Sequence, residues 1–252
     1  MTHTLLEAEN LDKCFNGVKA LADFSCAVHE REILGLIGPN GAGKTTLFNV
    51  LTGFIPSDGG KATFKGTNLL RLPPYRIARA GVARTFQNLR LIRRLSVLDN
   101  VLLAFQGQPG ERLRNVFFRP RASARQEAEN RQAALALLQD VGLAEKANDP
   151  AEALSYGQQK LLSLACCLAT GAELLLLDEP VVGIAPEMTE RILAVIRSLP
   201  GKGKSVVLIE HNLDAVMQVC DRVIFMDAGA KVSEGTPQEV RNDPKVIEAY
   251  LD

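Results

Sequence analysis

The most informative segment of the sequence is Ile33-Leu34-Gly35-Leu36-Ile37-Gly38-Pro39-Asn40-Gly41-Ala42-Gly43-Lys44-Thr45. Residues Ile33–Ile37 form a continuous apolar run ending at a glycine, which is typical of a buried strand in a parallel sheet. Residues 38–45 match the P-loop pattern G-x-x-x-x-G-K-[ST]. Residues Thr45–Leu51 then indicate a helix that ends near Gly53. A strand, a glycine-rich loop and a helix in this order predict a phosphate-binding loop.

The chemistry of this loop follows from its residue types. Glycines let successive backbone N–H groups point inward at anionic oxygens, and the helix N-terminus adds its positive dipole end. Lys44 would place a cation on the β- and γ-phosphates of a nucleotide, while the Thr45 hydroxyl can ligate Mg²⁺. The candidate nucleotide-binding residues of the loop are Gly38, Pro39, Asn40, Gly41, Ala42, Gly43, Lys44, Thr45 and Thr46.

A second acidic element lies far along the chain. The apolar strand Leu174–Leu177 is followed directly by Asp178 and Glu179. A carboxylate at the end of a buried strand can hold Mg²⁺, directly or through water, which is the role predicted for Asp178. Glu179 is then placed to act as general base toward an attacking water.

Composition limits the classes of function. Among 252 residues, Lys+Arg and Asp+Glu are both 29, so no bulk charge favours nucleic acid or anionic lipid. The apolar runs fall short of the ~18 residues that span a bilayer, and the N-terminus does not resemble a signal peptide. The 5 cysteines form an odd count without paired metal spacing. We therefore expect reduced thiols in a cytosolic protein. We expect any association with a membrane to be made through partner proteins.

Strand-like and helix-like segments alternate along the chain. Strands are predicted at Leu5–Leu11, Phe24–Val28, Ile33–Ile37, Lys61–Phe64, Val82–Phe86, Leu174–Leu177, Ser205–Ile209 and Val223–Met226. Helices are predicted at Thr45–Leu51, Ala128–Val141, Gly157–Thr170, Pro186–Leu199 and Leu213–Val219. This alternation predicts a largely parallel α/β core, residues 1–88 and 154–252, with a helical insertion at 89–153.

The most discriminating motif is Leu154-Ser155-Tyr156-Gly157-Gln158-Gln159. Ser155 has the spacing of an N-cap with Gln158 as its capping-box partner. A serine hydroxyl, glycine N–H groups and a helix N-terminus also make a second anion site. Here the chain resembles the ABC ATPase family, whose signature is Leu-Ser-x-Gly-Gln.

The resemblance covers essentially the whole chain. It implies a P-loop NTPase core of the ABC type (a mixed, RecA-like sheet) with an N-terminal antiparallel β part and an inserted α-helical subdomain. It implies ATP and Mg²⁺ as ligands, with Phe15 stacking on adenine and Gln87 contacting Mg²⁺ and the attacking water. His211 matches the histidine that contacts the γ-phosphate, and Ser155, Gly157 and Gln158 would cover the nucleotide of a second copy.

Within that family, the segments Val82–Asn88 and Leu95–Val101 resemble the larger ATPase subunit of branched-chain amino acid importers. The basic stretch Arg112–Arg125 also fits the same subunit. An alternative interpretation is that this stretch is a solvated loop without a specific partner. The implied partners are a second ATPase subunit (a sister ATPase or a second copy), two membrane channel subunits and, indirectly, an external substrate-binding protein. The resemblance implies a place on the cytoplasmic face of the cell membrane, with no nucleic-acid partner.

Alternatives remain at this level. Lipopolysaccharide-export and urea-importer ATPases are close relatives and are possible identities. A soluble ABC ATPase acting on nucleic acid or ribosomes is a second hypothesis, from another class of function. A nucleotide-binding regulatory module without turnover is a third hypothesis. The chain also departs from the family at Cys166, where relatives usually carry arginine, and at Asn212, where they carry aspartate. Ala185 replaces the usual Asp or Asn and cannot make a side-chain hydrogen bond.

Overall fold

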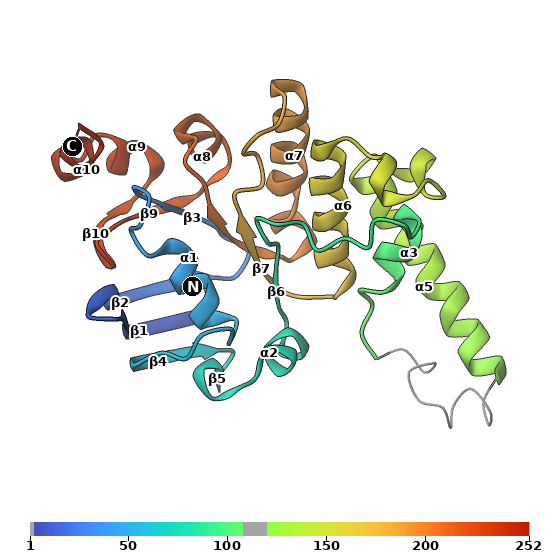
Figure 1. Cartoon of the computed structure of the whole chain (residues 1–252), viewed down its shortest axis with the longest axis horizontal. Helices are drawn as coiled ribbons and strands as arrows, with labels where there is room; N and C mark the ends of the chain where they lie inside the picture. Colours follow the sequence, from blue (N-terminus) through green and yellow to red (C-terminus); the bar gives the residue numbers. More distant parts are fainter. Residues whose placement is uncertain (1–2, 108–119, 252) are drawn as a thin grey trace. The chain divides into compact units, whose positions relative to one another are not determined.

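The computed structural model describes residues 3–107 and 120–251 and divides the chain into two compact units (Figure 1). The α/β unit comprises residues 1–87, 173–182 and 196–252. The helical unit comprises residues 88–172 and 183–195. Residues 112–119 of the basic stretch singled out above lie outside the described part.

The N-terminal part of the α/β unit is an antiparallel sheet with strand order β2-β1-β4-β5. Its strands are β1 (Thr4–Phe15), β2 (Val18–His29), β4 (Gly59–Phe64) and β5 (Thr67–Asn68). Strands β1 and β2 are longer than the predicted apolar segments. Buried and exposed residues alternate along each strand, and the strand continues past its buried residues. As a result, Phe15 ends β1 rather than lying in a loop.

The second sheet has the order β10-β9-β3-β8-β7-β6. Five strands are parallel to one another: β3 (Ile33–Ile37), β6 (Val82–Arg84), β7 (Leu174–Asp178), β8 (Ser205–Ile209) and β9 (Arg222–Asp227). Strand β10 (Ala230–Gly235) pairs antiparallel with β9. The largely parallel core is therefore confirmed. Every residue of β3, β7 and β8 is buried, as continuous apolar runs predict.

Short helices complete the α/β unit. They are α1 (Lys44–Leu51), α2 (Pro74–Ala80), α8 (Leu213–Val219), α9 (Pro237–Arg241) and α10 (Pro244–Leu251). One apolar core joins both sheets and α1, with Phe24 from β2, Phe64 from β4, Phe48 from α1 and Leu174 from β7 all almost fully buried. This shared core fixes α1, and with it the glycine loop, against both sheets.

The helical unit contains α3 (Val97–Leu102), α5 (Pro120–Asp140), α6 (Tyr156–Ala169) and most of α7 (Pro186–Ser198). Helix α6 packs against α3 and α5, burying its face that carries Leu161, Leu164 and Ala165. This packing explains why residues 154–172 belong to the helical unit, whereas the sequence analysis placed them with the α/β core.

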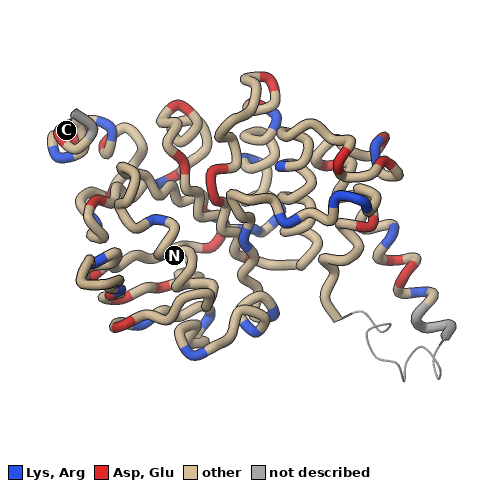
Figure 2. The backbone as a smooth tube through the Cα atoms, in the orientation of Figure 1, with Lys and Arg blue, Asp and Glu red and all other residues tan. Residues whose placement is uncertain are grey.

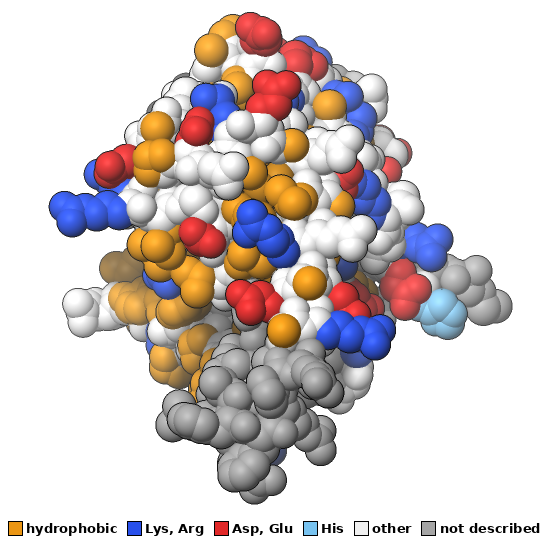
Figure 3. Space-filling model, turned by 90° about the vertical axis from the view of Figure 1, so that its right-hand side faces the viewer, with side chains coloured by type: hydrophobic (Ala, Val, Ile, Leu, Met, Phe, Trp, Pro, Cys, Tyr) orange, Lys and Arg blue, Asp and Glu red, His pale blue; other side chains and the backbone are white. Residues whose placement is uncertain are grey.

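Charges of both signs are distributed along the chain (Figure 2). On the face shown in Figure 3, hydrophobic side chains are interspersed with acidic and basic ones. Within the described residues, none of the helices combines the length and the apolar character needed to cross a bilayer.

Candidate functional site

Four candidate elements meet at one edge of the parallel sheet. The P-loop follows β3, Gln87 follows β6, Asp178 ends β7, and His211 follows β8. These strands are adjacent in the order β3-β8-β7-β6. Because the carboxyl ends of parallel strands face the same edge, residues far apart in sequence are brought together there.

The P-loop is shaped by close backbone approaches. A Cβ at Gly38 would lie 2.0 Å from the carbonyl oxygen of Met226, and a Cβ at Gly43 would lie 2.2 Å from that of Ala20. Both glycines also have positive φ, 146° and 100°, so no other residue fits either position without strain. A hollow of about 160 Å³ lies beside the loop. It is lined by Asn40, Gly41, Ala42, Gly43, Lys44, Thr45, Thr46, Glu179 and His211.

Lys44 is held inside this loop. Its Nζ donates to the carbonyl oxygens of Gly38, at 2.7 Å, and Pro39, at 2.8 Å. Burial lowers the pKa of Lys44 from the ordinary lysine value, while the nearby carboxylates of Glu179 and Asp178 act in the opposite direction. The ammonium group is thus oriented by backbone oxygens at the wall of the hollow.

Glu179 contacts both of the other residues predicted to act in catalysis, Gln87 and His211. Oε2 of Glu179 accepts a hydrogen bond from Nε2 of Gln87 at 2.9 Å, and Oε1 lies 3.0 Å from Nε2 of His211. Glu179 has a φ of 50°, a left-handed conformation that is costly for a residue with a side chain. The fold therefore holds this carboxylate in a strained position between an amide and an imidazole.

Sequence reasoning missed Arg84. Its guanidinium donates to Oδ2 of Asp178 at 2.7 Å, and the two side chains are 5% and 4% exposed. It also donates to Oδ1 of Asn49 at 2.6 Å and lies over the rings of Phe48 and Phe86. The sequence signal was a basic residue at the carboxyl end of a buried strand, where a buried charge needs a partner.

Phe15 and the signature residues occupy different units. Phe15, in the α/β unit, is 42% exposed, and Nζ of Lys13 lies 5.4 Å from its ring centroid. Ser155, Gly157 and Gln158 lie in the helical unit at the start of α6.

The predicted capping box at α6 is confirmed. Oγ of Ser155 accepts from the N–H of Gln158 at 3.4 Å, and Oε1 of Gln158 accepts from the N–H of Ser155 at 3.0 Å. Gly157 has an additional structural role, because a Cβ there would lie 2.4 Å from Cγ of Met188. The signature glycine is thus required by packing within the helical unit itself.

Two departures from the family pattern have local explanations. Cys166 lies in α6, and its Sγ donates to the carbonyl oxygen of Asn100 at 3.4 Å. Burial raises the pKa of this thiol to about 12, so it is a neutral, inert group. Asn212 is the N-cap of α8, and its Oδ1 accepts from the N–H of Ala215 at 3.1 Å. Asparagine performs this capping role as well as aspartate does.

Comparisons with known proteins agree with this geometry. Residues 21–182 match the family described as ABC transporter, and residues 230–251 match the family described as branched-chain amino acid ATP-binding cassette transporter.

The chain is 41% identical over 252 residues to the high-affinity branched-chain amino acid transport ATP-binding protein LivG of Salmonella typhimurium, covering 100% of this chain and 99% of that protein. It is 39% identical to the corresponding protein BraF of Pseudomonas aeruginosa, with the same coverage.

Solved structures give the same result. The crystal structure of a nucleotide-free ATP-binding cassette from an ABC transporter matches with a TM-score of 0.86 and 33% identity, covering 99% of this chain and 100% of that one. The ADP conformation of an ATP-binding cassette matches with a TM-score of 0.85 and 32% identity, covering 99% of both chains. The chain therefore belongs to the family of ABC transporter ATPases, enzymes that bind and hydrolyse ATP.

Proposed function

We propose that this ATPase powers an importer of branched-chain amino acids, working as one of two ATPase subunits beneath a membrane channel. The C-terminal family match at residues 230–251 and the names of the full-length relatives support this choice of substrate. The observation that carries the hydrolytic role is the position of Glu179, held by Gln87 and His211 at the wall of the P-loop hollow.

In this proposal, each chain supplies half of a nucleotide site. The P-loop N–H groups and Lys44 bind the phosphates from one side, and Phe15 offers an exposed aromatic face to adenine. Ser155, Gly157 and Gln158 of a second copy, or the equivalent residues of a sister ATPase, close the site over the γ-phosphate. The γ-phosphate then stabilises the closed pair, because it makes contacts that are absent after hydrolysis.

Glu179 acts as the general base in this scheme. Its carboxylate takes a proton from the attacking water, Gln87 orients that water, and His211 contacts the γ-phosphate. The contacts that Glu179 makes with Gln87 and His211 support this scheme, because groups in mutual contact could share one water molecule. They also restrict the carboxylate to a narrow range of positions, which favours proton transfer.

The donor set also fits Mg²⁺. Thr45 contributes a hydroxyl at the wall of the hollow, Gln87 an amide oxygen, and Asp178 a carboxylate, all hard oxygen ligands. Arg84 engages Oδ2 of Asp178, and no described residue donates to the other oxygen, Oδ1. When bound, Mg²⁺ would neutralise charge on the β- and γ-phosphates.

The implied partners follow from the same function. These are a second ATPase subunit, two channel subunits and an external substrate-binding protein that delivers the amino acid to the channel. The chain would lie on the inner face of the cell membrane and reach the bilayer only through the channel subunits.

The hydrolytic role is tested with Glu179→Gln, which keeps the shape of the side chain and removes the base. We expect ATP binding to persist while turnover falls by about 10²–10⁴-fold, the usual contribution of a general base. The matched control is Glu173→Gln, an exposed carboxylate paired with Lys65, which should leave turnover unchanged. Turnover of Glu179→Gln near the original rate would eliminate Glu179 as the base.

The substrate is tested separately, by reconstituting the chain with its channel and binding-protein partners in vesicles. We expect ATP-dependent uptake of leucine, isoleucine and valine. Uptake of urea or an unrelated solute with no uptake of these amino acids would reject the substrate assignment and leave the ATPase assignment intact.

A further inference from the structure

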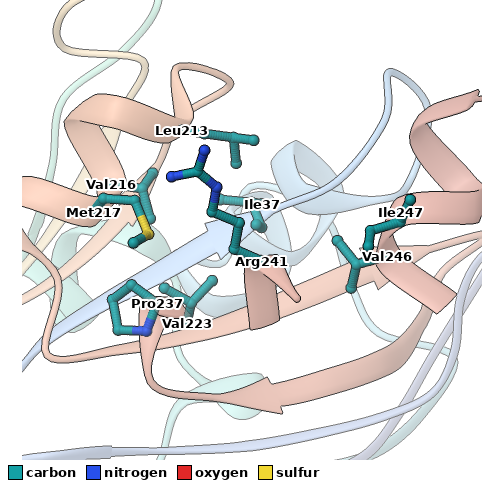
Figure 4. Close-up of a pocket in the computed structure, with 9 residues that line it drawn as sticks. All are labelled: Ile37, Leu213, Val216, Met217, Val223, Pro237, Arg241, Val246 and Ile247. Atoms are coloured by element: carbon teal, nitrogen blue, oxygen red, sulfur yellow. The ribbon is translucent and has the colours of Figure 1, made fainter. Parts of the chain in front are cut away.

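A second hollow lies in the α/β unit, apart from the P-loop. It measures about 270 Å³ and is bounded by α8, α9 and α10 together with β3 and β9 (Figure 4). Its walls are almost wholly apolar and include Ile37 from β3, Val223 from β9, Val216 from α8 and Val246 from α10. None of its lining residues belongs to the nucleotide site described above.

The hollow opens to solvent, because Arg241 and Ile247 in its lining are exposed. Ile37, Val216, Val223 and Val246 belong to a small apolar cluster that is separate from the main core. A hollow of about 270 Å³ is close to the lower limit of small-molecule sites, which begin at roughly 300 Å³.

One charged side chain lines this hollow. Arg241, in the last turn of α9, extends its guanidinium over the apolar walls toward Leu213 (Figure 4). Within residues 3–107 and 120–251, no carboxylate forms an ion pair with it. A planar guanidinium with open donors above an apolar floor is suited to a carboxylate attached to an aliphatic chain.

The lining contains no acidic residue to balance a positive group on the ligand. Asp243, two residues after α9, is not among the lining residues. An ammonium group on the apolar floor would lose part of its hydration without gaining a partner, which is unfavourable. The lining therefore favours a ligand without an ammonium group.

We propose that this hollow, bounded by α8, α9 and α10, binds a short aliphatic monocarboxylate that lacks an ammonium group. The guanidinium of Arg241 holds the carboxylate, and the aliphatic chain fills the space beside Ile37, Val216 and Val223. The ligand would lie against α8, which begins two residues after His211.

The test is calorimetric titration of the purified full-length chain with 4-methyl-2-oxopentanoate, and separately with leucine, which has the same carbon skeleton but carries an ammonium group. We expect the oxo acid to bind with a dissociation constant below about 1 mM, and leucine to bind at least tenfold more weakly. Arg241→Gln should weaken oxo-acid binding at least tenfold, because a hydrogen bond to a charged group is lost.

Two further variants keep the result interpretable. Lys245→Gln removes a neighbouring exposed cation that does not line the hollow and should leave binding unchanged. Ile247→Glu alters a half-exposed lining residue and supplies a carboxylate to Arg241 from within the protein, so it should abolish binding. Equal affinity for leucine and the oxo acid, undiminished binding to Arg241→Gln, or a dissociation constant for the oxo acid above about 1 mM would each overturn the proposal. Because the titration needs no nucleotide, its outcome is independent of the proposed transport function.

Discussion

The two helices assigned to phosphate binding, α1 and α6, begin in opposite ways. Helix α1 follows Gly43, which has a φ of 100° and offers no side-chain cap. Helix α6 follows Ser155, whose hydroxyl and backbone N–H are both paired with Gln158. The N-terminal N–H groups of α1 are thus left for a ligand, whereas those of α6 are already partly satisfied by the chain.

The charges around the two helices differ as well. Near α1, the buried side chains of Lys44 and Arg84 lie close to the acidic pair Asp178–Glu179. At the start of α6 the hydrogen-bonding groups are neutral, and Gly157 is packed against Met188. The α1 region therefore contains buried charge, which in the proposed function would hold the phosphates. The start of α6 is instead capped by neutral groups of its own chain, and in the proposed function it would contact the nucleotide of a second subunit.

The largest expected effect comes from removing a buried cation near α1. Arg84→Met leaves Asp178 charged, buried and unpaired, which should lower the free energy of unfolding by about 3–5 kcal/mol. Urea denaturation measures this change. Lys65→Met is the matched control, since it breaks the exposed pair with Glu173 and should cost less than about 1 kcal/mol. Equal losses from the two variants would mean that Arg84 is not structurally coupled to Asp178.

Lys44→Met tests the role of the α1 region in catalysis. Without the ammonium group the phosphates lose a charged donor, and turnover should fall by about 10²–10³-fold, as when one transition-state donor is removed. Steady-state ATP hydrolysis is the readout. The circular dichroism spectrum and melting temperature should stay near their original values. A variant that hydrolyses ATP at an undiminished rate would show that the charge beside the loop is dispensable.

Gly157→Ala tests packing in the α6 region. A methyl group would contact Cγ of Met188, and overpacking of this kind costs about 1–3 kcal/mol of unfolding free energy. Met188→Ala removes the contact and, in the double variant, should recover part of the loss. Absence of coupling between the two substitutions would contradict the packing role of Gly157.

Ser155→Ala should have a small effect on stability, about 1 kcal/mol, because it removes one N-cap. Ser155→Asn keeps a capping oxygen and should be close to neutral in thermal denaturation. A loss as large with asparagine as with alanine would show that the cap is not what stabilises the start of α6.

The sequence was sufficient to predict most of the site. The P-loop, the acidic pair Asp178–Glu179 and the cap at Ser155 are local patterns in which residue type and spacing carry the chemistry. The family resemblance implies a γ-phosphate role for His211, but its contact with Glu179 is not predicted, because it depends on β7 and β8 being neighbours in the sheet.

Other features depend on packing between distant segments. Arg84 is missed because nothing in Val82-Ala83-Arg84 shows that its partner is Asp178. Gly157 is identified as a signature residue, but its approach to Met188 cannot be read from spacing. For the same reason, the alternation of segments assigns residues 154–172 to the α/β core, whereas their packing on α3 and α5 makes them part of the helical unit.

The most direct test of the shared nucleotide site measures ATP-dependent pairing by light scattering, in a Glu179→Gln background that prevents turnover. The chain carries either Ser155→Asn or Ser155→Asp and is examined alone and with a candidate sister ATPase. Both substitutions keep the cap of α6, but only aspartate places a negative charge where the γ-phosphate would bind. We predict that ATP doubles the mass with asparagine and not with aspartate. Undiminished pairing with aspartate would contradict a nucleotide held between the P-loop of one subunit and the capped helix of the other.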